Sequence, residues 1–397
     1  MYTDKIENVG YIDFKLCFNA GLAYEQDNQY GITHLLEHML FRGIGKCDYN
    51  SLEKCFRNMG TEVYGKTGYD YLSLSFSVLP TKINEVLLYL NELYSVPDWT
   101  GNDLRKEKEI IIHELKLKET SFSNRIRFIY DNKFLNKSVM GCASSIKNIS
   151  LSKLKKYHSK IINPNNSTLF ISGDISDESI NTVYAFLSNI KNINEQALIT
   201  QNILIPQSAF NRKNCYCLDY DNYKYSDLYI NFDVDSKNQS AARFIQYYLS
   251  GYTSPLSEIM IDENAFSYEL YSHLDEWKDF SILSFAITCK YDCLCKVIDT
   301  FKSALLNLIN DFSQQKYNET VDFIKLEKRK ALSNPEMMNE SKFYKYFYGI
   351  DVDIPTYRQV LDAMKSVFSN KNLTVYSTYC INRKNVVNSI LELSNML

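Results

Sequence analysis

Apolar and polar residues alternate along two stretches in the first part of the chain, Tyr11–Phe18 and Tyr71–Leu79. A period of two is typical of strands that bury one face and expose the other. Both stretches are therefore predicted to be strands.

Several other segments are predicted to be helices, because a polar capping residue stands where the helix would begin or a glycine where it would end. Asn50-Ser51 could cap a helix that runs to Met59 and stops at Gly60, and Ser150 or Ser152 could cap one that reaches Ile162. Further helices are predicted at 82–95, 103–119 and 179–190. The chain is expected to mix helices and strands along its whole length.

Two patterns of the first half recur in the second half. The stretch 166–172 (NSTLFIS) is predicted to be a strand, and its first five residues are echoed at 372–376 (NLTVY). A helix candidate follows in both places, at 385–393 in the second. The strand 11–18 (YIDFKLCF) is likewise echoed at 227–234 (DLYINFDV). Chance similarity would explain either pair alone, but their order along the chain indicates two related α+β domains.

The joint between the two domains is predicted at 191–214, which is polar and irregular and contains Pro206. The expected organisation is a first domain at 1–190, a linker at 191–214 and a second domain at 215–397. Each domain would hold about 190 residues, within the ordinary range for a folded domain.

Composition narrows the class of protein further. The 397 residues are 45% hydrophobic and 23% charged, a globular balance, and the net charge of −3 favours neither nucleic acid nor an anionic membrane as a partner. No apolar run approaches the roughly 20 residues of a membrane span, and the N-terminus lacks the apolar core of a signal peptide. A cytoplasmic location is expected.

The ten cysteines are expected to be reduced in that location. The pairs Cys215-x-Cys217 and Cys293-x-Cys295 have the wrong spacing for a zinc site.

The most informative segment is 31–41, which carries His34, Glu37 and His38. Positions i, i+3 and i+4 of a helix share one face, so these side chains would project together. Two imidazoles one turn apart can hold a divalent metal, and a carboxylate beside them can take a proton from a metal-bound water. With five histidines in the chain, chance explains the spacing poorly. A buried helix with hydrogen-bonded histidines is the structural alternative.

A catalytic zinc site needs a third protein ligand, and the helix predicted at 103–119 offers candidates. Glu107 and Glu114 lie seven residues apart, two turns along one face. Taken alone, Glu114 could equally be a surface partner of Lys118, and Glu107 a solvated charge. His113 is a rival ligand, but it lies about 100° around the helix from Glu114.

The spacing of these residues resembles that of the pitrilysin, insulysin and mitochondrial-processing-peptidase family of zinc peptidases, the inverzincins, and of its half-length bacterial members in particular. Their pattern is His-x-x-Glu-His, then about 75 residues, then a Glu ligand with another Glu seven before it. Here 75 residues (39 to 113) separate His38 from Glu114, and Glu107 precedes Glu114 by seven. The stretch 39–43 (MLFRG) after the motif also agrees.

The resemblance implies a role for each of these residues. His34, His38 and Glu114 would bind zinc, Glu37 would be the general base and later proton donor, and Glu107 would support a histidine ligand. It also implies a fold of two tandem homologous domains, each a mainly antiparallel sheet packed with helices. The first domain would be catalytic, and the second would be non-catalytic and serve substrate enclosure and dimerisation.

Two departures from the family bear on substrate and partner. Tyr64-Gly65 stands where the family often has Asn-Ala, so the Asn that holds substrate backbone is missing. In the second half, the family's Arg seven residues before a Tyr corresponds to Ile261 before Tyr268, and Tyr268 alone remains to bind substrate. A heterodimer with a homologous subunit that lacks the zinc motif but supplies the Arg is therefore expected, with a homodimer as the alternative.

The function predicted is that of a zinc metalloendopeptidase acting on small unstructured peptides, among them a ribosomally made peptide that requires maturation. The alternative from a different class is a non-catalytic, zinc-bearing scaffold or partner subunit. Because inactive relatives usually lose the motif and every position is intact here, the enzyme is favoured.

Overall fold

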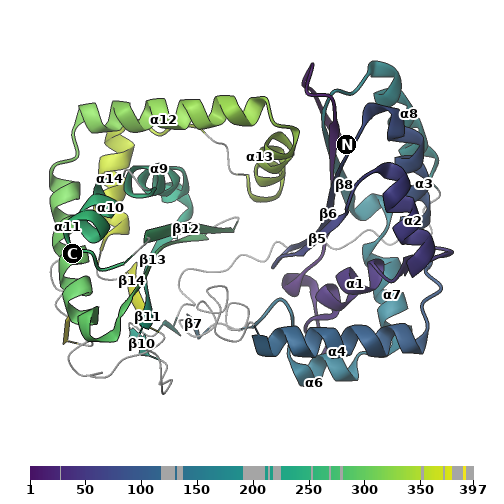
Figure 1. The fold of residues 1–397 in the computed structure, drawn as a ribbon, viewed down its shortest axis with the longest axis horizontal. Helices are drawn as coiled ribbons and strands as arrows, with labels where there is room; N and C mark the ends of the chain where they lie inside the picture. The colour runs from purple at the N-terminus through teal and green to yellow at the C-terminus, as the bar shows by residue number, and fades with distance from the viewer. Residues whose placement is uncertain are drawn as a thin grey trace. The chain divides into compact units, whose positions relative to one another are not determined.

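The computed structural model describes residues 1–26, 28–117, 130–131, 137–190, 211–212, 215–217, 225–251, 254–267, 270–277, 280–349, 353–369, 372–377 and 388–389. Its described residues divide into two compact units (Figure 1). The first unit lies within Met1–Asn124, Lys137–Ile203 and Arg329–Phe343, and the second within Arg125–Asn136, Leu204–Lys328 and Tyr344–Leu397.

The first unit is built on a five-stranded sheet in the order β1-β8-β2-β6-β5. The parallel pair β1–β8 is followed by three antiparallel pairs, so the sheet is mainly antiparallel and β5 forms one edge. Its strands are β1 (Tyr2–Lys5), β2 (Ile12–Asn19), β5 (Tyr64–Thr67), β6 (Tyr71–Val78) and β8 (Ser167–Gly173).

Helices cover one face of this sheet (Figure 1). The apolar residues of the central strand β2, such as Phe14, Leu16 and Phe18, are buried in one core with the apolar sides of these helices. The helices are α1 (Ile32–Leu40), α2 (Tyr49–Met59), α3 (Ile83–Leu93), α4 (Gly101–Leu117), α6 (Ala143–Asn148), α7 (Leu151–Ile161) and α8 (Asp177–Asn189), with a small hairpin of β3 (Gly43–Ile44) and β4 (Cys47–Asp48).

The other face of the first sheet is polar, and part of α13 (Pro335–Tyr348) packs on it. Asn339 is fully buried there, and its amide donates to the Asp13 carboxylate at 2.7 Å and to the Asp13 carbonyl at 2.9 Å. Ser172 on β8 donates to the Asn339 side-chain oxygen at 2.7 Å. Arg329–Phe343 falls within the range 215–397 expected for the second domain, yet it belongs to the first compact unit.

The second unit repeats the sheet of the first, in the order β10-β14-β11-β13-β12. Again one parallel pair, β10–β14, is followed by three antiparallel pairs. The strands are β10 (Cys215–Cys217), β11 (Tyr225–Asp235), β12 (Leu270–Trp277), β13 (Phe280–Lys290) and β14 (Leu373–Ser377), and a further short pair joins β7 (Tyr130–Asp131) to β9 (Asn211–Arg212).

The helices of the second unit pack with its sheet around a separate apolar core, which includes Phe232, Phe285 and Phe301. They are α9 (Gln239–Leu249), α10 (Pro255–Ser257), α11 (Leu294–Asn310), α14 (Tyr357–Val367) and most of α12 (Gln314–Leu332), with a π-helical turn at Glu258–Glu263.

The internal repeat expected from the sequence is confirmed by this equivalence. The echoed segments 166–170 and 372–376 fall on β8 and β14, which hold the second place in their sheets. The segments 11–18 and 227–234 fall on β2 and β11, the central strands. The fold is thus α+β with two similar domains, as predicted.

Most predicted elements match the described ones within a few residues. One cap differs: Asp48, not Asn50 or Ser51, caps α2, because its carboxylate accepts from the backbone N–H of Ser51 at 2.9 Å. The linker 191–214 lies outside the described residues except for β9, and the helix expected at 385–393 does so except for 388–389. Among the described residues, no helix combines the length and apolar character that a membrane span requires.

Candidate metal centre

The helix α1 carries the histidine motif, and a half-buried carboxylate, that of Glu25, fixes where the helix begins. Both carboxylate oxygens of Glu25 accept from backbone N–H groups of the first turn, those of Gly31 at 2.8 Å and Thr33 at 2.9 Å. Burial raises the pKa of Glu25, and these hydrogen bonds oppose the rise. Since the first N–H groups of a helix have no partner inside it, Glu25 satisfies two of them.

Gly31 is needed at this start for two reasons. Its φ of +86° is one that glycine adopts without strain, and a Cβ there would lie 2.5 Å from the carbonyl oxygen of Met140. The hydroxyl of Thr33, two residues on, is 2.7 Å from that of Tyr157 on α7. The N-terminus of α1 is therefore held tightly against its surroundings.

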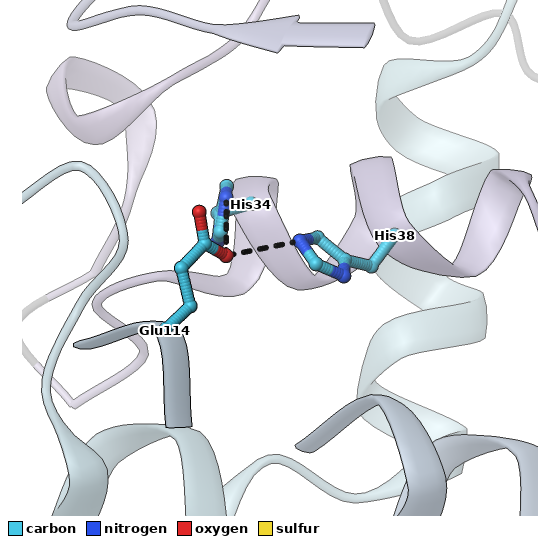
Figure 2. Close-up of side chains that lie close together, drawn as sticks. All are labelled: His34, His38 and Glu114. Carbon is cyan, nitrogen blue, oxygen red and sulfur yellow. Dashed lines mark ion pairs between the residues drawn. The ribbon is translucent and has the colours of Figure 1, made fainter. Parts of the chain in front are cut away.

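The motif side chains lie as the helical spacing predicts, and α4 supplies the third group. Oε2 of Glu114 is 3.9 Å from Nε2 of His34 and 3.5 Å from Nε2 of His38. Figure 2 shows the Glu114 carboxylate pointing toward both rings. Within the described part of the chain, these three form the one group of three or more His, Cys, Asp or Glu residues with ligand atoms mutually within 4.8 Å.

These distances fit a zinc ion. Zinc binds nitrogen and oxygen ligands at about 2.0–2.2 Å in tetrahedral geometry, which puts neighbouring ligand atoms roughly 3.3–3.6 Å apart. The separations of 3.5 and 3.9 Å are close to that spacing. Two imidazole nitrogens and one carboxylate oxygen are also a common donor set of catalytic zinc, with a fourth position left for water.

Glu107 lies behind His38 and fixes which ring nitrogen is available. Its Oε2 is 3.0 Å from Nδ1 of His38, so Nδ1 carries the proton and Nε2 faces Glu114. Its Oε1 accepts from Nε of Arg42. Burial would raise the pKa of Glu107, but the hydrogen bonds from His38 and Arg42 outweigh it and lower the pKa.

The pKa of His38 itself is raised. Burial disfavours the charged imidazole, but the hydrogen bond to Glu107 and the negative charges of Glu107, Glu37 and Glu114 outweigh that effect. The centre therefore concentrates negative charge around the two rings. This negative charge favours the binding of a cation at the two imidazoles.

Glu37 projects from α1 toward the edge strand β5. The hydroxyl of Thr67 donates to its Oε2. Gly65, two residues before Thr67, lies so close that a Cβ there would be 2.7 Å from Oε1 of Glu37. The carboxylate is thus placed beside the histidine pair and against a strand.

Other candidates from the sequence lie elsewhere. His113 is exposed and lines an open hollow with Arg42, Lys106, Glu109 and Ile110, outside the metal group. Tyr268 lies outside the described residues. Ile261 is in the π-helical turn and packs against the apolar core of the second unit.

The roles of three residues of this centre could not be identified from the sequence. Arg42 follows the motif closely, but a lone Arg after a helix carries no local signal of a buried ion pair. Thr67 and Gly65 belong to a strand whose place next to Glu37 depends on the sheet. In each case the role depends on a contact between segments far apart in the chain.

Comparisons with known proteins agree with this arrangement. The family model described as Insulinase (Peptidase family M16) matches residues 10–143, and the model described as Peptidase M16 inactive domain matches residues 148–323. The first match includes the two histidines, Glu37, Glu107 and Glu114.

Curated relatives are described as zinc proteases. The uncharacterized zinc protease YmxG of Bacillus subtilis is 25% identical over 169 residues, 41% of this chain and 41% of that protein. The zinc protease PqqE of Helicobacter pylori is 20% identical over 340 residues, 80% of this chain and 76% of that protein. For several relatives the chain spans less than half of their length, at 41%, 19% and 43%.

The fold is shared with solved structures. A protease from Helicobacter pylori superposes with a TM-score of 0.80 over 93% of this chain and 94% of that one, at 16% sequence identity. At this identity the likeness concerns the fold alone.

Proposed function

Because this chain belongs to the insulinase family of peptidases (peptidase family M16), we propose that it is a zinc-dependent endopeptidase acting on small unstructured peptides. The observation that carries the proposal is the convergence of His34, His38 and Glu114 at zinc-ligand spacing beside the Glu37 carboxylate. A precursor of a ribosomally made peptide is one such substrate.

Each residue has a distinct task in this reaction. His34, His38 and Glu114 would hold the zinc ion, which when bound polarises a water molecule and the scissile carbonyl. Glu37 takes a proton from the water as it attacks the carbonyl carbon, and later gives that proton to the leaving amine nitrogen. The peptide C–N bond breaks, and one water molecule is consumed.

Glu107 and Arg42 fix the orientation and protonation of the ligand His38. Glu107 accepts from Nδ1 of His38, which leaves Nε2 as the ligand atom. Arg42 pairs with the buried Glu107 carboxylate and keeps it charged. Neither residue needs to contact the substrate.

We extend the proposal to a heterodimer. Ile261 is partly buried against the core of the second unit and has no polar side-chain atom to offer a peptide. Arg243 on α9 donates to both carboxylate oxygens of Glu276 at 2.7 Å, so its guanidinium is already engaged within the second unit. A homologous subunit without the zinc motif would then supply the Arg that grips the substrate.

The alternative is a subunit that keeps the fold and the zinc but does not cleave peptides. The family includes domains described as inactive, and the model of such a domain matches residues 148–323 of this chain. The intact Glu37 favours the enzyme, because a carboxylate is not needed beside the histidines of a purely structural site.

A peptide-library cleavage assay distinguishes the peptidase from the non-cleaving subunit. It is run on zinc-loaded protein, alone and with co-expressed homologous subunits, and on a His34→Ala, His38→Ala variant. The peptidase reading predicts cleavage that disappears in the double variant together with the zinc. Absence of cleavage in all assemblies despite a bound zinc would favour the scaffold.

A further inference from the structure

The Glu37 carboxylate is held on the edge strand β5 by a specific contact. Oε2 of Glu37 accepts a hydrogen bond from the Thr67 hydroxyl. A glutamate side chain has several rotatable bonds, so a partner on a neighbouring element is needed to keep it in one place. Thr67, the last residue of β5, is that partner.

Gly65 allows the carboxylate to lie this close to the strand. A Cβ at Gly65 would be 2.7 Å from Cγ, 2.7 Å from Oε1 and 3.0 Å from the carboxylate carbon of Glu37. The φ of Gly65 is not among the positive values. Its backbone conformation therefore does not require glycine, but a Cβ there would have to displace the Glu37 carboxylate from its present position.

The position of β5 is fixed by its neighbour in the sheet. Gly65 pairs with Leu74 and Thr67 with Leu72, two fully buried residues of β6. Because side chains alternate along a strand, Gly65 and Thr67 share one face and Tyr64 takes the other. Tyr64 is 65% exposed and donates to Glu62, not to the metal centre.

We propose that Thr67 and Gly65 are positioning residues for the general base: Thr67 holds Oε2 of Glu37, and Gly65 leaves room for the carboxylate beside the strand. This inference rests on the proposed function, since it assigns Glu37 the role of base. It adds residues in the strand where Tyr64-Gly65 departs from the family pattern.

The first test is kinetic and uses a fluorogenic peptide substrate with the protein in its active assembly. Thr67→Val keeps the shape and removes the hydroxyl, and is expected to lower kcat by roughly 10- to 100-fold, the effect of losing one hydrogen bond to a charged group. KM and zinc content should stay close to those of the wild type. Thr67→Ser, which keeps the hydroxyl, should restore most of kcat, and Gly65→Ala should lower kcat with zinc retained.

A matched control distinguishes positioning from general damage to the strand. Thr61→Val makes the same change just before β5, where the hydroxyl donates only to the carbonyl of Glu62, and should leave kcat unchanged. In a Glu37→Gln background, Thr67→Val should have little further effect, because both changes act on one interaction. Independent effects that multiply would overturn the proposal.

A binding measurement keeps the inference testable without turnover. A peptide hydroxamate binds catalytic zinc and donates a hydrogen bond to the neighbouring base, so calorimetry on zinc-loaded protein reports the position of Glu37. Thr67→Val and Gly65→Ala should weaken its binding by about 10-fold or more. A wild type that binds the hydroxamate but cleaves no peptide, alone or with any co-expressed homologous subunit, would refute the proposed function, and the hydroxamate affinities of the variants would then decide the inference. Equal affinity and equal kcat in wild type and Thr67→Val would overturn the inference, as would a wild type that does not bind the hydroxamate at all.

Discussion

Nδ1 of His38 lies 3.0 Å from Oε2 of Glu107, while Nε2 of the same ring faces Glu114 at 3.5 Å. The carboxylates of Glu107 and Glu114, both on α4, therefore lie next to opposite nitrogens of the His38 ring. Glu114 lies on the side where a metal would bind, and Glu107 lies behind the ring.

This arrangement predicts different effects for the two glutamates. Glu114→Gln removes a charged ligand atom and should weaken zinc binding most strongly. Glu107→Gln should lower zinc affinity or rate on the order of 10- to 100-fold, the usual effect of losing the partner of a histidine ligand. A competitive zinc titration with a chromogenic chelator measures both. A greater loss in Glu107→Gln than in Glu114→Gln would mean that ligand and support are interchanged.

Arg42 should affect the metal indirectly. Arg42→Gln leaves the buried Glu107 with one cationic partner fewer, so His38 is held less firmly. Because Arg42 lies one contact further from the metal site than Glu107, Arg42→Gln should lower zinc affinity by about 3- to 10-fold, less than Glu107→Gln. Arg105→Gln on α4 is the control, because Arg105 makes an exposed pair with Glu109. Equal affinity in Arg42→Gln and Arg105→Gln would show that Arg42 is not part of the support.

Asn339 should stabilise the first unit. Asn339→Ala removes the donors to Asp13 and the acceptor of Ser172, and leaves a buried carboxylate short of partners. A loss of about 2–4 kcal/mol in the free energy of unfolding is expected. Urea unfolding in a Trp277→Phe background follows the first unit through buried Trp99.

The control for this change is Asn181→Ala, at an exposed position of α8. It should shift the unfolding free energy by less than about 0.5 kcal/mol. Similar values for the two variants would indicate that the contact of α13 with the first sheet contributes little to stability.

Assembly provides the next prediction. If a homologous subunit supplies the missing Arg, the isolated chain should cleave peptides weakly or not at all, and the co-expressed subunit should restore cleavage. Native mass spectrometry of the purified material gives the composition, and the peptide assay gives the activity. Full activity from a monomer or homodimer would refute the two-subunit proposal.

The local part of this architecture could be predicted from the sequence. The alternation at 11–18 and its echo at 227–234 identify the central strands of both sheets, because the period of two is a property of neighbouring residues. The grouping of His34, Glu37 and His38 follows in the same way from the helical repeat.

Contacts between distant segments could not be predicted in this way. Nothing in the local pattern of Asn339 indicates that it bonds to Asp13, 326 positions earlier in the chain. The contact between Thr67 and Glu37 depends on α1 lying beside the edge of the sheet. Glu114 was found only because a family spacing connected it to the histidines, since its own helix offers equally good surface roles.

The most direct test of the account compares zinc content and peptide cleavage in wild type and Glu37→Gln, in the active assembly. The amide cannot accept the proton from water, and losing a general base typically costs about 10²- to 10⁴-fold in rate. About one zinc per chain is expected in both proteins, with a loss of turnover of that size in Glu37→Gln. Cleavage by Glu37→Gln at nearly the wild-type rate, with zinc bound, would contradict the role of Glu37 as the general base.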